Sequence, residues 1–395
     1  MKNIFTLIAF TFIALNGISQ GTWLQKNSYA GSGRYRAIAF EINGKCYMGT
    51  GAILGPNNDL KDLWEYDVAL DIWTQMADLT GPKRRNATAT SANGFGYVGL
   101  GSDSLTLLND WWQYDPAGNT WQVKTSFPAG SRFGAGSFTI QDIIYTGGGL
   151  DSANNPKTDF YAYDPVNDVW HQKASMNIGV ASMAVFTIGQ KGYFVTGLIN
   201  GSVSSVNTTM EYDANTDTWA IKTPYPAGNT FSAIGFAING EGYVGTGFTG
   251  TLIDVMYHYN PVNNIWNQET NWPTGSRQWA VSCVSGNRAF VGTGNSTGGL
   301  LFNDWWEFIP LSTKINELKN MNTFNASFNS TSQEISIVTE NGSGILKIFN
   351  LKGQLIFESK INSAKQNFSL NQQGIFIVTL MDDNKLLTTK VACIY

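Results

Sequence analysis

Tryptophan recurs at a fixed interval along most of the chain, and this period constrains the fold more than any other feature. Six tryptophans are spaced about 49 residues apart: Trp23, Trp73, Trp121, Trp170, Trp219 and Trp266. A period of this length is typical of proteins in which each repeat is one supersecondary unit. Such a unit cannot bury its apolar face alone and has to stack against its neighbours. The chain is therefore expected to fold as an array of stacked units.

Two further markers recur in phase with the tryptophans. An aromatic residue followed by Asp or Asn lies shortly before each later tryptophan: Tyr66-Asp67, Tyr114-Asp115, Tyr163-Asp164, Tyr212-Asp213 and Tyr259-Asn260. A Gly-rich strand end lies further upstream in every unit: Tyr47–Gly51, Tyr97–Gly101, Tyr145–Gly149, Tyr193–Gly197, Tyr243–Gly247 and Phe290–Gly294. Alternating apolar runs and Asn-Gly turn signals divide each unit into four short strands, named a to d, as in 37–42, 46–51, 63–67 and 72–75.

Composition excludes several other classes of protein. Only 14% of the residues are charged, whereas about 25% is usual. The aromatic content of 13% is incompatible with a disordered chain, and the abundant glycine is incompatible with a coiled coil. A net charge of −4 provides no electrostatic footprint for nucleic acid.

The three phased markers resemble Kelch repeats, whose signature is a glycine pair ending strand b, a Tyr-Asp-Pro-like step after strand c and a Trp in strand d. The resemblance covers residues 22 to about 310, although the paired glycines survive only at Gly147-Gly148-Gly149 and elsewhere read Gly-x-Gly. The sixth unit has Ile315 where strand d would place a Trp, and the N-terminal phrase Trp23-Leu24-Gln25-Lys26 has no strands a to c before it. We therefore expect the N-terminal strand to complete the last blade, which would remove exposed sheet edges.

The predicted fold class is thus all-β. It comprises a six-bladed Kelch-type β-propeller over residues 21–312, closed by the N-terminal strand, a linker over 313–325 and a small C-terminal β-sandwich over 326–395. Residues 1–20 have one early positive charge, a short apolar run and a polar end, which is typical of a secretory signal peptide cleaved near Gln20. No later apolar run reaches the roughly 18 residues that a transmembrane helix needs. The sequence accordingly predicts an exported protein without a transmembrane segment.

The last 70 residues lack the tryptophan period and contain alternating runs that predict about seven short strands. The phrases 348–354 and 373–378, with a closing Lys390-Val391, resemble the type A C-terminal sorting domain of type IX secretion in Bacteroidetes. That resemblance implies contact with the type IX secretion machinery, removal of the domain, and release or attachment at the cell surface by way of the periplasm. The alternative is a second binding module of immunoglobulin type.

Loop lengths indicate which face of the array recognises a ligand. The a–b and c–d turns are short and uniform, whereas the b–c connections are long and differ between units. Variable loops on a rigid scaffold are where recognition is usually found, so the b–c/d–a face is the predicted binding face. Four arginines lie near one phase of the repeat just before strand a: Arg36, Arg85, Arg132 and Arg277. Because strand a is innermost, we expect them to ring the channel mouth and to bind an anionic ligand, unless they only hydrogen-bond carbonyls of neighbouring blades.

Other recurring residues favour structural roles. Four aspartates recur four residues before the aromatic of strand c, namely Asp62, Asp110, Asp159 and Asp304, and we expect them to cap the b–c loops, with a contribution to the binding face as the alternative. The phased tryptophans and tyrosines are expected to pack between blades rather than to stack on sugars. Three scattered cysteines, Cys46, Cys283 and Cys393, are expected to be small buried apolar residues and not a disulfide framework.

The residue types available for catalysis favour a binding protein over an enzyme. Two histidines, His171 and His258, are too few for copper chemistry of the galactose-oxidase type or for a multi-histidine zinc site. We expect no metal and no cofactor. The phrase Arg85–Ala89 resembles the start of strand a in Kelch-type sialic-acid mutarotases, so a carbohydrate mutarotase or epimerase is one alternative. The main prediction is an exported Kelch-repeat protein that binds a glycan or protein ligand on the b–c/d–a face, and a structural or adhesive surface protein is the other alternative.

Overall fold

The computed structural model describes residues 21–200, 204–310, 324–329, 334–339, 344–350, 354–369, 374–382 and 385–393. The predicted signal peptide and most of the predicted linker lie outside these ranges. The chain divides into two compact units, with the boundary between Leu311 and Ser312. Each unit is described by itself.

The described part of the first unit is built from six four-stranded antiparallel sheets, numbered I to VI. Sheet I contains β2 (Ile38–Ile42), β3 (Lys45–Gly49), β4 (Leu63–Asp67) and β5 (Ile72–Met76). Sheet II contains β6 (Thr88–Ala92), β7 (Phe95–Gly99), β8 (Trp111–Asp115) and β9 (Thr120–Lys124). Sheet III contains β10 (Gly136–Ile140), β11 (Ile143–Gly147), β12 (Phe160–Asp164) and β13 (Val169–Lys173). In each, the strand order follows the chain from the innermost strand outward.

Sheets IV and V have the same topology, and sheet VI differs in the source of its outer strand. Sheet IV contains β14 (Ala184–Ile188), β15 (Lys191–Leu198), β16 (Ser205–Asp213) and β17 (Thr218–Lys222). Sheet V contains β18 (Ile234–Ile238), β19 (Glu241–Gly245), β20 (Met256–Asn260) and β21 (Ile265–Glu269). Sheet VI contains β22 (Val281–Ser285), β23 (Arg288–Gly292), β24 (Trp305–Ile309) and β1 (Thr22–Lys26). A short 3-10 helix, Thr297–Gly299, precedes β24.

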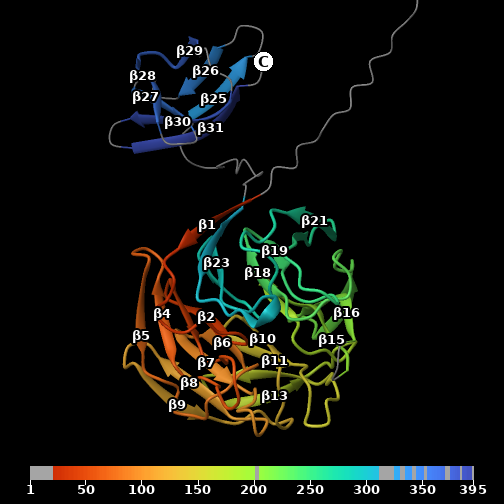
Figure 1. Cartoon of the computed structure of the whole chain (residues 1–395). Helices are drawn as coiled ribbons and strands as arrows, with labels where there is room; N and C mark the ends of the chain where they lie inside the picture. Colours follow the sequence, from red (N-terminus) through yellow and green to blue (C-terminus); the bar gives the residue numbers. More distant parts are fainter. Residues whose placement is uncertain are drawn as a thin grey trace, which may run out of the picture. The chain divides into compact units, whose positions relative to one another are not determined.

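The N-terminal strand β1 runs antiparallel to β24, with Trp23 opposite Phe308 and Lys26 opposite Trp305. Figure 1 shows β1 on the same side of this unit as β23 of sheet VI. The six innermost strands β2, β6, β10, β14, β18 and β22 neighbour one another in that order, and β22 also neighbours β2. A ring of backbone hydrogen bonds of 2.7–3.3 Å, here called the collar, joins the same six sheets. In each sheet, the residue two positions before the inner strand donates its N–H to the carbonyl of the equivalent residue in the preceding sheet. The collar residues are Arg36, Asn86, Gly134, Ser182, Ser232 and Trp279.

Three of the a–b turns contain an Asn-Gly pair and have the geometry that this pair predicts. Asn43 and Gly44 have φ of 52° and 85°, and both angles are positive as a type I′ turn requires. Such turns join strands with a tight two-residue connection, so the face that carries them has little irregular chain. The long connections all lie on the opposite side of each sheet, between strands b and c and between strand d and the next strand a.

The repeated tryptophans join neighbouring sheets. The indole N–H of each donates a hydrogen bond of 2.8–3.2 Å to a carbonyl just after the outer strand of the preceding sheet. Their rings pack on phased aromatics, as Trp73 does on Tyr66 at 4.9 Å and on Trp305 of sheet VI at 5.2 Å. This dual role of ring and N–H explains why one residue type recurs at this position.

The expectation that all cysteines are unbonded is wrong for two of them. Cys46 in β3 and Cys283 in β22 form a disulfide across 237 residues of sequence. The pairing could not be inferred from spacing, because sheets I and VI become neighbours only when the circle of sheets is complete. The bond lies in the apolar layer between them, with Met48, Phe290 and Trp305.

The described part of the second unit contains seven strands in two antiparallel sheets. One sheet contains β25 (Phe324–Asn329), β26 (Glu334–Thr339) and β29 (Lys365–Ser369). The other contains β27 (Gly344–Asn350), β28 (Leu355–Ile361), β30 (Gly374–Asp382) and β31 (Lys385–Cys393). Both sheets contribute to one core, as Ile337 of the first and Ile348 and Val378 of the second do. A core enclosed by two antiparallel sheets is the architecture of a β-sandwich.

Within the described ranges, no helix is long and apolar enough to cross a membrane.

Candidate functional site

Three consecutive positions before each inner strand determine the chemistry of the b–c/d–a face. Backbone pairing aligns these positions between sheets. The first position holds Arg34, Arg84, Arg132, Val180, Thr230 and Arg277. The second position holds Tyr35, Arg85, Phe133, Ala181, Phe231 and Gln278. The third position is the collar already described. The four predicted arginines therefore occupy three different positions, with Arg132 and Arg277 in the first, Arg85 in the second and Arg36 in the third.

First-position arginines are buried and bonded to the phased aspartates. Arg84 is 0% exposed, and its two terminal nitrogens donate to the carboxylate of Asp110 at 2.8 and 2.7 Å. The other three pairs have the same bidentate geometry: Arg34 with Asp62, Arg132 with Asp159 and Arg277 with Asp304. Arg132 and Arg277 are thus enclosed structural residues, which corrects the expected ring of four ligand-binding arginines. The aspartates are likewise partners of arginine side chains, whereas backbone caps were expected.

Each of these arginines also fixes the loop that follows strand b. Arg84 Nη1 donates to the carbonyl of Leu100 at 3.1 Å, and equivalent bonds reach Thr50, Gly148 and Thr293. Burial alone would raise the pKa of Asp62, but the hydrogen bonds and charge of Arg34 outweigh it and hold that pKa below its usual value. Bidentate Arg–carboxylate pairs combine charge with fixed geometry. The d–a loop, strand b and strand c are thereby held together at one point.

Arg85 lies at the channel mouth and is partly neutralised. Its Nε is 2.8 Å from Oδ1 of Asp59, whose carboxylate is fully buried. Its terminal nitrogen Nη2 donates to the hydroxyl of Ser104, and that hydroxyl donates to the other carboxylate oxygen of Asp59. Arg85, Ser104 and Asp59 therefore form a closed network that holds the guanidinium group in one orientation.

Arg36 differs from the other five of these arginines because no carboxylate in the described part of the chain pairs with it. Its guanidinium carbon lies 4.0 Å from the ring centroid of Trp279 and 5.2 Å from that of Tyr35. Its Nε is buried without a hydrogen-bond partner among the described residues. Burial is the main cause that lowers the pKa of Arg36; Tyr35 and the more distant Asp59 raise it in part, and the charge of Arg85 lowers it. The backbone of Arg36 is also in the left-handed region at φ 58°, a conformation that costs energy for a residue with a side chain.

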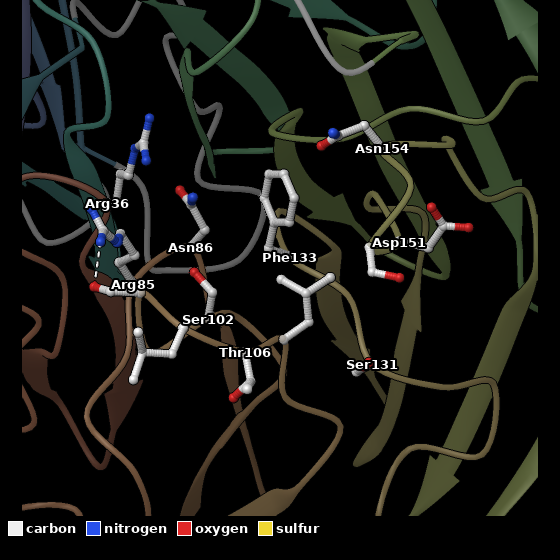
Figure 2. A pocket seen from close by; sticks show the side chains of 13 residues that line it. Arg36, Arg85, Asn86, Ser102, Thr106, Ser131, Phe133, Asp151 and Asn154 are labelled. Carbon is white, nitrogen blue, oxygen red and sulfur yellow. Dashed lines mark hydrogen bonds between the residues drawn. The ribbon is translucent and has the colours of Figure 1, made fainter. Parts of the chain in front are cut away.

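The two arginines line a cavity of about 660 Å³ on the b–c/d–a face (Figure 2). Its wall includes the b–c loop of sheet II at Ser102 and Thr106 and that of sheet III at Asp151 and Asn154. In Figure 2 Arg36 and Arg85 lie together on one side, whereas Asp151 and Asn154 lie on the opposite side. A pocket of this size can hold a ligand of a few hundred daltons.

The remaining acidic group of the cavity is already paired. Asp151 lies 2.6 Å from Lys157, and the hydrogen bond from Lys157 lowers the pKa of Asp151 to about 2. A carboxylate with that pKa is a weak base at neutral pH. Both carboxylates near the arginines, Asp151 and Asp59, are thus engaged in ion pairs.

Sheets III to V give the channel mouth an apolar part. Leu150, Ala181, Leu198 and Phe231 form a buried cluster, against which Phe133 and Trp279 pack. Phe133 also lines the cavity of Arg85, and Trp279 packs on Arg36, so the apolar part of the mouth adjoins its cationic part. A sugar ring or a peptide side chain can pack on such aromatic surfaces while an anionic group reaches the arginines.

Neither histidine lines the cavity of Arg36 and Arg85 or the channel. A second cavity of about 230 Å³ is lined by small residues of all six inner strands, such as Ala39, Ala89 and Ser137. His258 in β20 lies 2.9 Å from Glu269, and His171 is in the outer strand β13. Among the described residues, no group of three or more His, Cys, Asp or Glu side chains could hold a metal ion.

Comparison with known proteins supports the fold. The family model of the Kelch motif matches residues 131–177, which span sheet III. Among solved structures, one titled "Structure of YjhT" superposes with a TM-score of 0.60 at 18% identity, covering 71% of this chain and 96% of that chain. No curated protein matches the chain. The matches confirm the Kelch motif and the propeller-like all-β architecture; at this identity the structural similarity shows the fold alone.

Proposed function

We propose that the chain is an exported six-bladed Kelch-type propeller, closed by β1, that binds an anionic glycan or an acidic protein segment at the mouth of its channel. The observation that carries the proposal is Arg36, a half-buried cation without an anionic partner among the described residues. A buried charge is costly unless it is paired. A carboxylate bound in the cavity would provide the missing partner for Arg36.

Several features prepare Arg36 for this role. The collar fixes its backbone, Trp279 and Tyr35 hold its guanidinium plane, and Arg85 keeps the local potential positive. A preorganised group loses little entropy when it binds a ligand. The apolar part of the mouth would then contact the uncharged part of the same ligand.

A binding protein fits the cavity better than the mutarotase or epimerase alternative. Such a reaction needs a proton donor and acceptor beside the sugar. The nearby carboxylates of Asp59 and Asp151 are both engaged in ion pairs. The signal-peptide pattern and the resemblance of the last 70 residues to a type A sorting domain support delivery by type IX secretion to the cell surface or beyond.

The proposal is tested by calorimetric titration of the chain with monosaccharides that carry a carboxylate, such as sialic acid, and with neutral sugars of the same size. We expect acidic sugars alone to bind, and Arg36→Gln to weaken binding roughly tenfold to a hundredfold. The matched control is Lys173→Gln, which removes the same charge at an outer strand and should leave binding unchanged. Equal binding by wild type and Arg36→Gln would refute the proposed site.

Two further outcomes separate the alternatives. Accelerated exchange between the anomers of an acidic sugar, followed by NMR, would favour a mutarotase. If no sugar or acidic peptide binds, the propeller is a structural or adhesive protein without a small-molecule site.

A further inference from the structure

A repeated contact joins the c–d turn of each sheet to the outer strand of the sheet before it. One turn residue accepts a hydrogen bond from the backbone N–H that follows the preceding outer strand. It also accepts one from the phased tyrosine of its own strand c. The turn residues are Asp71, Asn119, Asp168, Asp217 and Asn264.

The last residue of the preceding outer strand is Lys or Met at all five of these junctions. Where the turn residue is Asp, the strand ends in Lys, and the ion pairs are Lys26–Asp71 at 3.5 Å, Lys124–Asp168 at 4.0 Å and Lys173–Asp217 at 3.5 Å. Where the turn residue is the uncharged Asn119 or Asn264, the strand ends in Met76 or Lys222. Three of the five junctions thus have negative charge on the turn and positive charge on the strand end, and none has an acidic strand end.

The junction between sheets V and VI reverses this polarity. Because β1 supplies the outer strand of sheet VI, no c–d turn exists there, and Gly21 occupies the place of the turn residue directly before β1. The strand end of sheet V is Glu269, in place of Lys or Met. Strand c of sheet VI has Phe308 in the place of the tyrosine, so the hydroxyl donor is also missing. All three changes occur at the one junction where the chain is interrupted.

The atoms of this junction are close and enclosed. The nitrogen of Gly21 lies 2.8 Å from Oε2 of Glu269, which is 5% exposed. The hydroxyl of Thr270 donates to the carbonyl of Gly21, and the N–H of Thr270 lies 3.3 Å from the same Oε2. A Cβ at position 21 would lie 2.5 Å from Cζ of Phe308 and 2.9 Å from the carbonyl oxygen of Ile309. The site therefore accepts glycine and no larger residue without rearrangement.

The other oxygen of Glu269 has its own partner. Oε1 lies 2.9 Å from Nδ1 of His258, whose Nε2 is 3.2 Å from the side-chain nitrogen of Asn267. His258 thus accounts for one oxygen of the carboxylate, and Oε2 remains directed at the nitrogen of Gly21. In the uncleaved chain the N–H groups of Gly21 and Thr270 supply that oxygen with hydrogen bonds but no charge, whereas an ammonium group at Gly21 would supply a cation.

We propose that Gly21 is the first residue of the mature protein and that Glu269 is the binding site for its α-ammonium group. A leader peptidase would hydrolyse the Gln20–Gly21 bond, with water supplying the hydroxyl of the new Gln20 carboxyl group and a proton of the new amine. The amine takes up a further proton at neutral pH and becomes a cation. Its three N–H donors then lie beside Oε2, where the repeat otherwise has an Asp–Lys pair of the opposite polarity.

The consequence is that β1 is anchored fully only after the leader is removed. The same strand completes sheet VI, so leader removal would strengthen the closure of the propeller after export. This inference depends on the export part of the proposed function and is independent of the ligand at Arg36.

Two measurements test it. First, the N-terminal peptide of the protein exported by its natural host, identified by mass spectrometry, should begin at Gly21. A chain that begins at Gln20 or Thr22, or one with a blocked N-terminus, would overturn the inference but leave export intact. A chain exported with its leader uncut would overturn both.

Second, residues 21–395 are prepared behind a removable leader, and thermal unfolding is followed before and after a protease exposes Gly21. We expect leader removal to raise Tm by roughly 3 °C, as about 1 kcal/mol would in a domain of this size. Glu269→Gln keeps an acceptor without the charge and should abolish the gain. Glu211→Gln, at a buried carboxylate paired with Lys191, should lower Tm but keep the gain. An equal gain in wild type and Glu269→Gln, or none in wild type, would contradict the inference.

Discussion

The disulfide between Cys46 and Cys283 makes a quantitative prediction about ring closure. It closes a loop of 237 residues, which in the chain-entropy model reduces the entropy of the unfolded chain by an amount equivalent to roughly 5 kcal/mol at 25 °C. Reduction should therefore lower Tm by roughly 10 °C for a domain of this size. The oxidising conditions outside the cytoplasm, which the proposed export implies, are those in which such a bond persists.

The assay is thermal or denaturant unfolding of the oxidised and reduced chain, together with the double variant Cys46→Ala/Cys283→Ala. Alanine also removes two buried sulfur atoms, so the decisive quantity is the difference between oxidised and reduced samples, which should vanish in the double variant. Cys393→Ser lies in the second unit and should leave the difference unchanged. Thiol titration of the unfolded, unreduced protein should find one free thiol. Three free thiols, or equal stability with and without reductant, would refute the reasoning.

Two other predictions concern the arginines. Arg84→Met removes the partner of Asp110 in a buried bidentate pair and should lower the free energy of unfolding, measured with denaturant, by about 3 kcal/mol. Arg36→Met removes an unpaired cation and should change that free energy by less than about 0.5 kcal/mol. Equal losses would mean that the two side chains have similar partners. The pKa of Asp62 is lowered on folding, so the stability it contributes is present above the unfolded value of about 3.9 and is lost as the pH falls through the lower folded value. Asp62→Asn should accordingly reduce stability at pH 7 and flatten the acid side of the stability profile, and an unchanged profile would contradict the pairing with Arg34.

The sequence predicted the strand pattern well because its markers are local. Strand-ending glycines and phased tryptophans report a backbone conformation or a contact that recurs from unit to unit, and Asn-Gly turns do so in three of the units, so the register of one unit predicts the others. The alternating runs of the last 70 residues predicted about seven short strands, and the described part of the second unit has seven. The Cys46–Cys283 bond was missed because it links residues that are distant in sequence and meet only in the assembled array.

The roles of the arginines were only partly predicted, because a shift of one residue along the segment before strand a changes what the side chain contacts. Side chains at the first, second and third positions before strand a point to different surroundings: a carboxylate within the sheet, the loop face and the collar. Arg85 and its neighbour Arg84 therefore have different roles, although both fit the phase to within one residue. Sequence spacing alone does not resolve this difference, because loop residues lack the strict alternation of a strand.

Sheets IV and V lack the Arg–Asp pair, and comparing them with the other four sheets indicates the role of the pair. The pair occurs where strands b and c are joined by long connections: residues 50–62, 100–110, 148–159 and 293–304. In sheet IV the strands themselves extend, and Gly197 pairs with Val206 and Leu198 with Ser205. In sheet V the connection, residues 246–255, is shorter. In both sheets the arginine and the aspartate are missing together, as expected if each has value only with the other. The pair is thus a clamp for long loops, and sheets I and II, which carry Arg36 and Arg85, both have it. The proposed binding site is consequently held on its cationic side by pairs whose residues do not line the cavity.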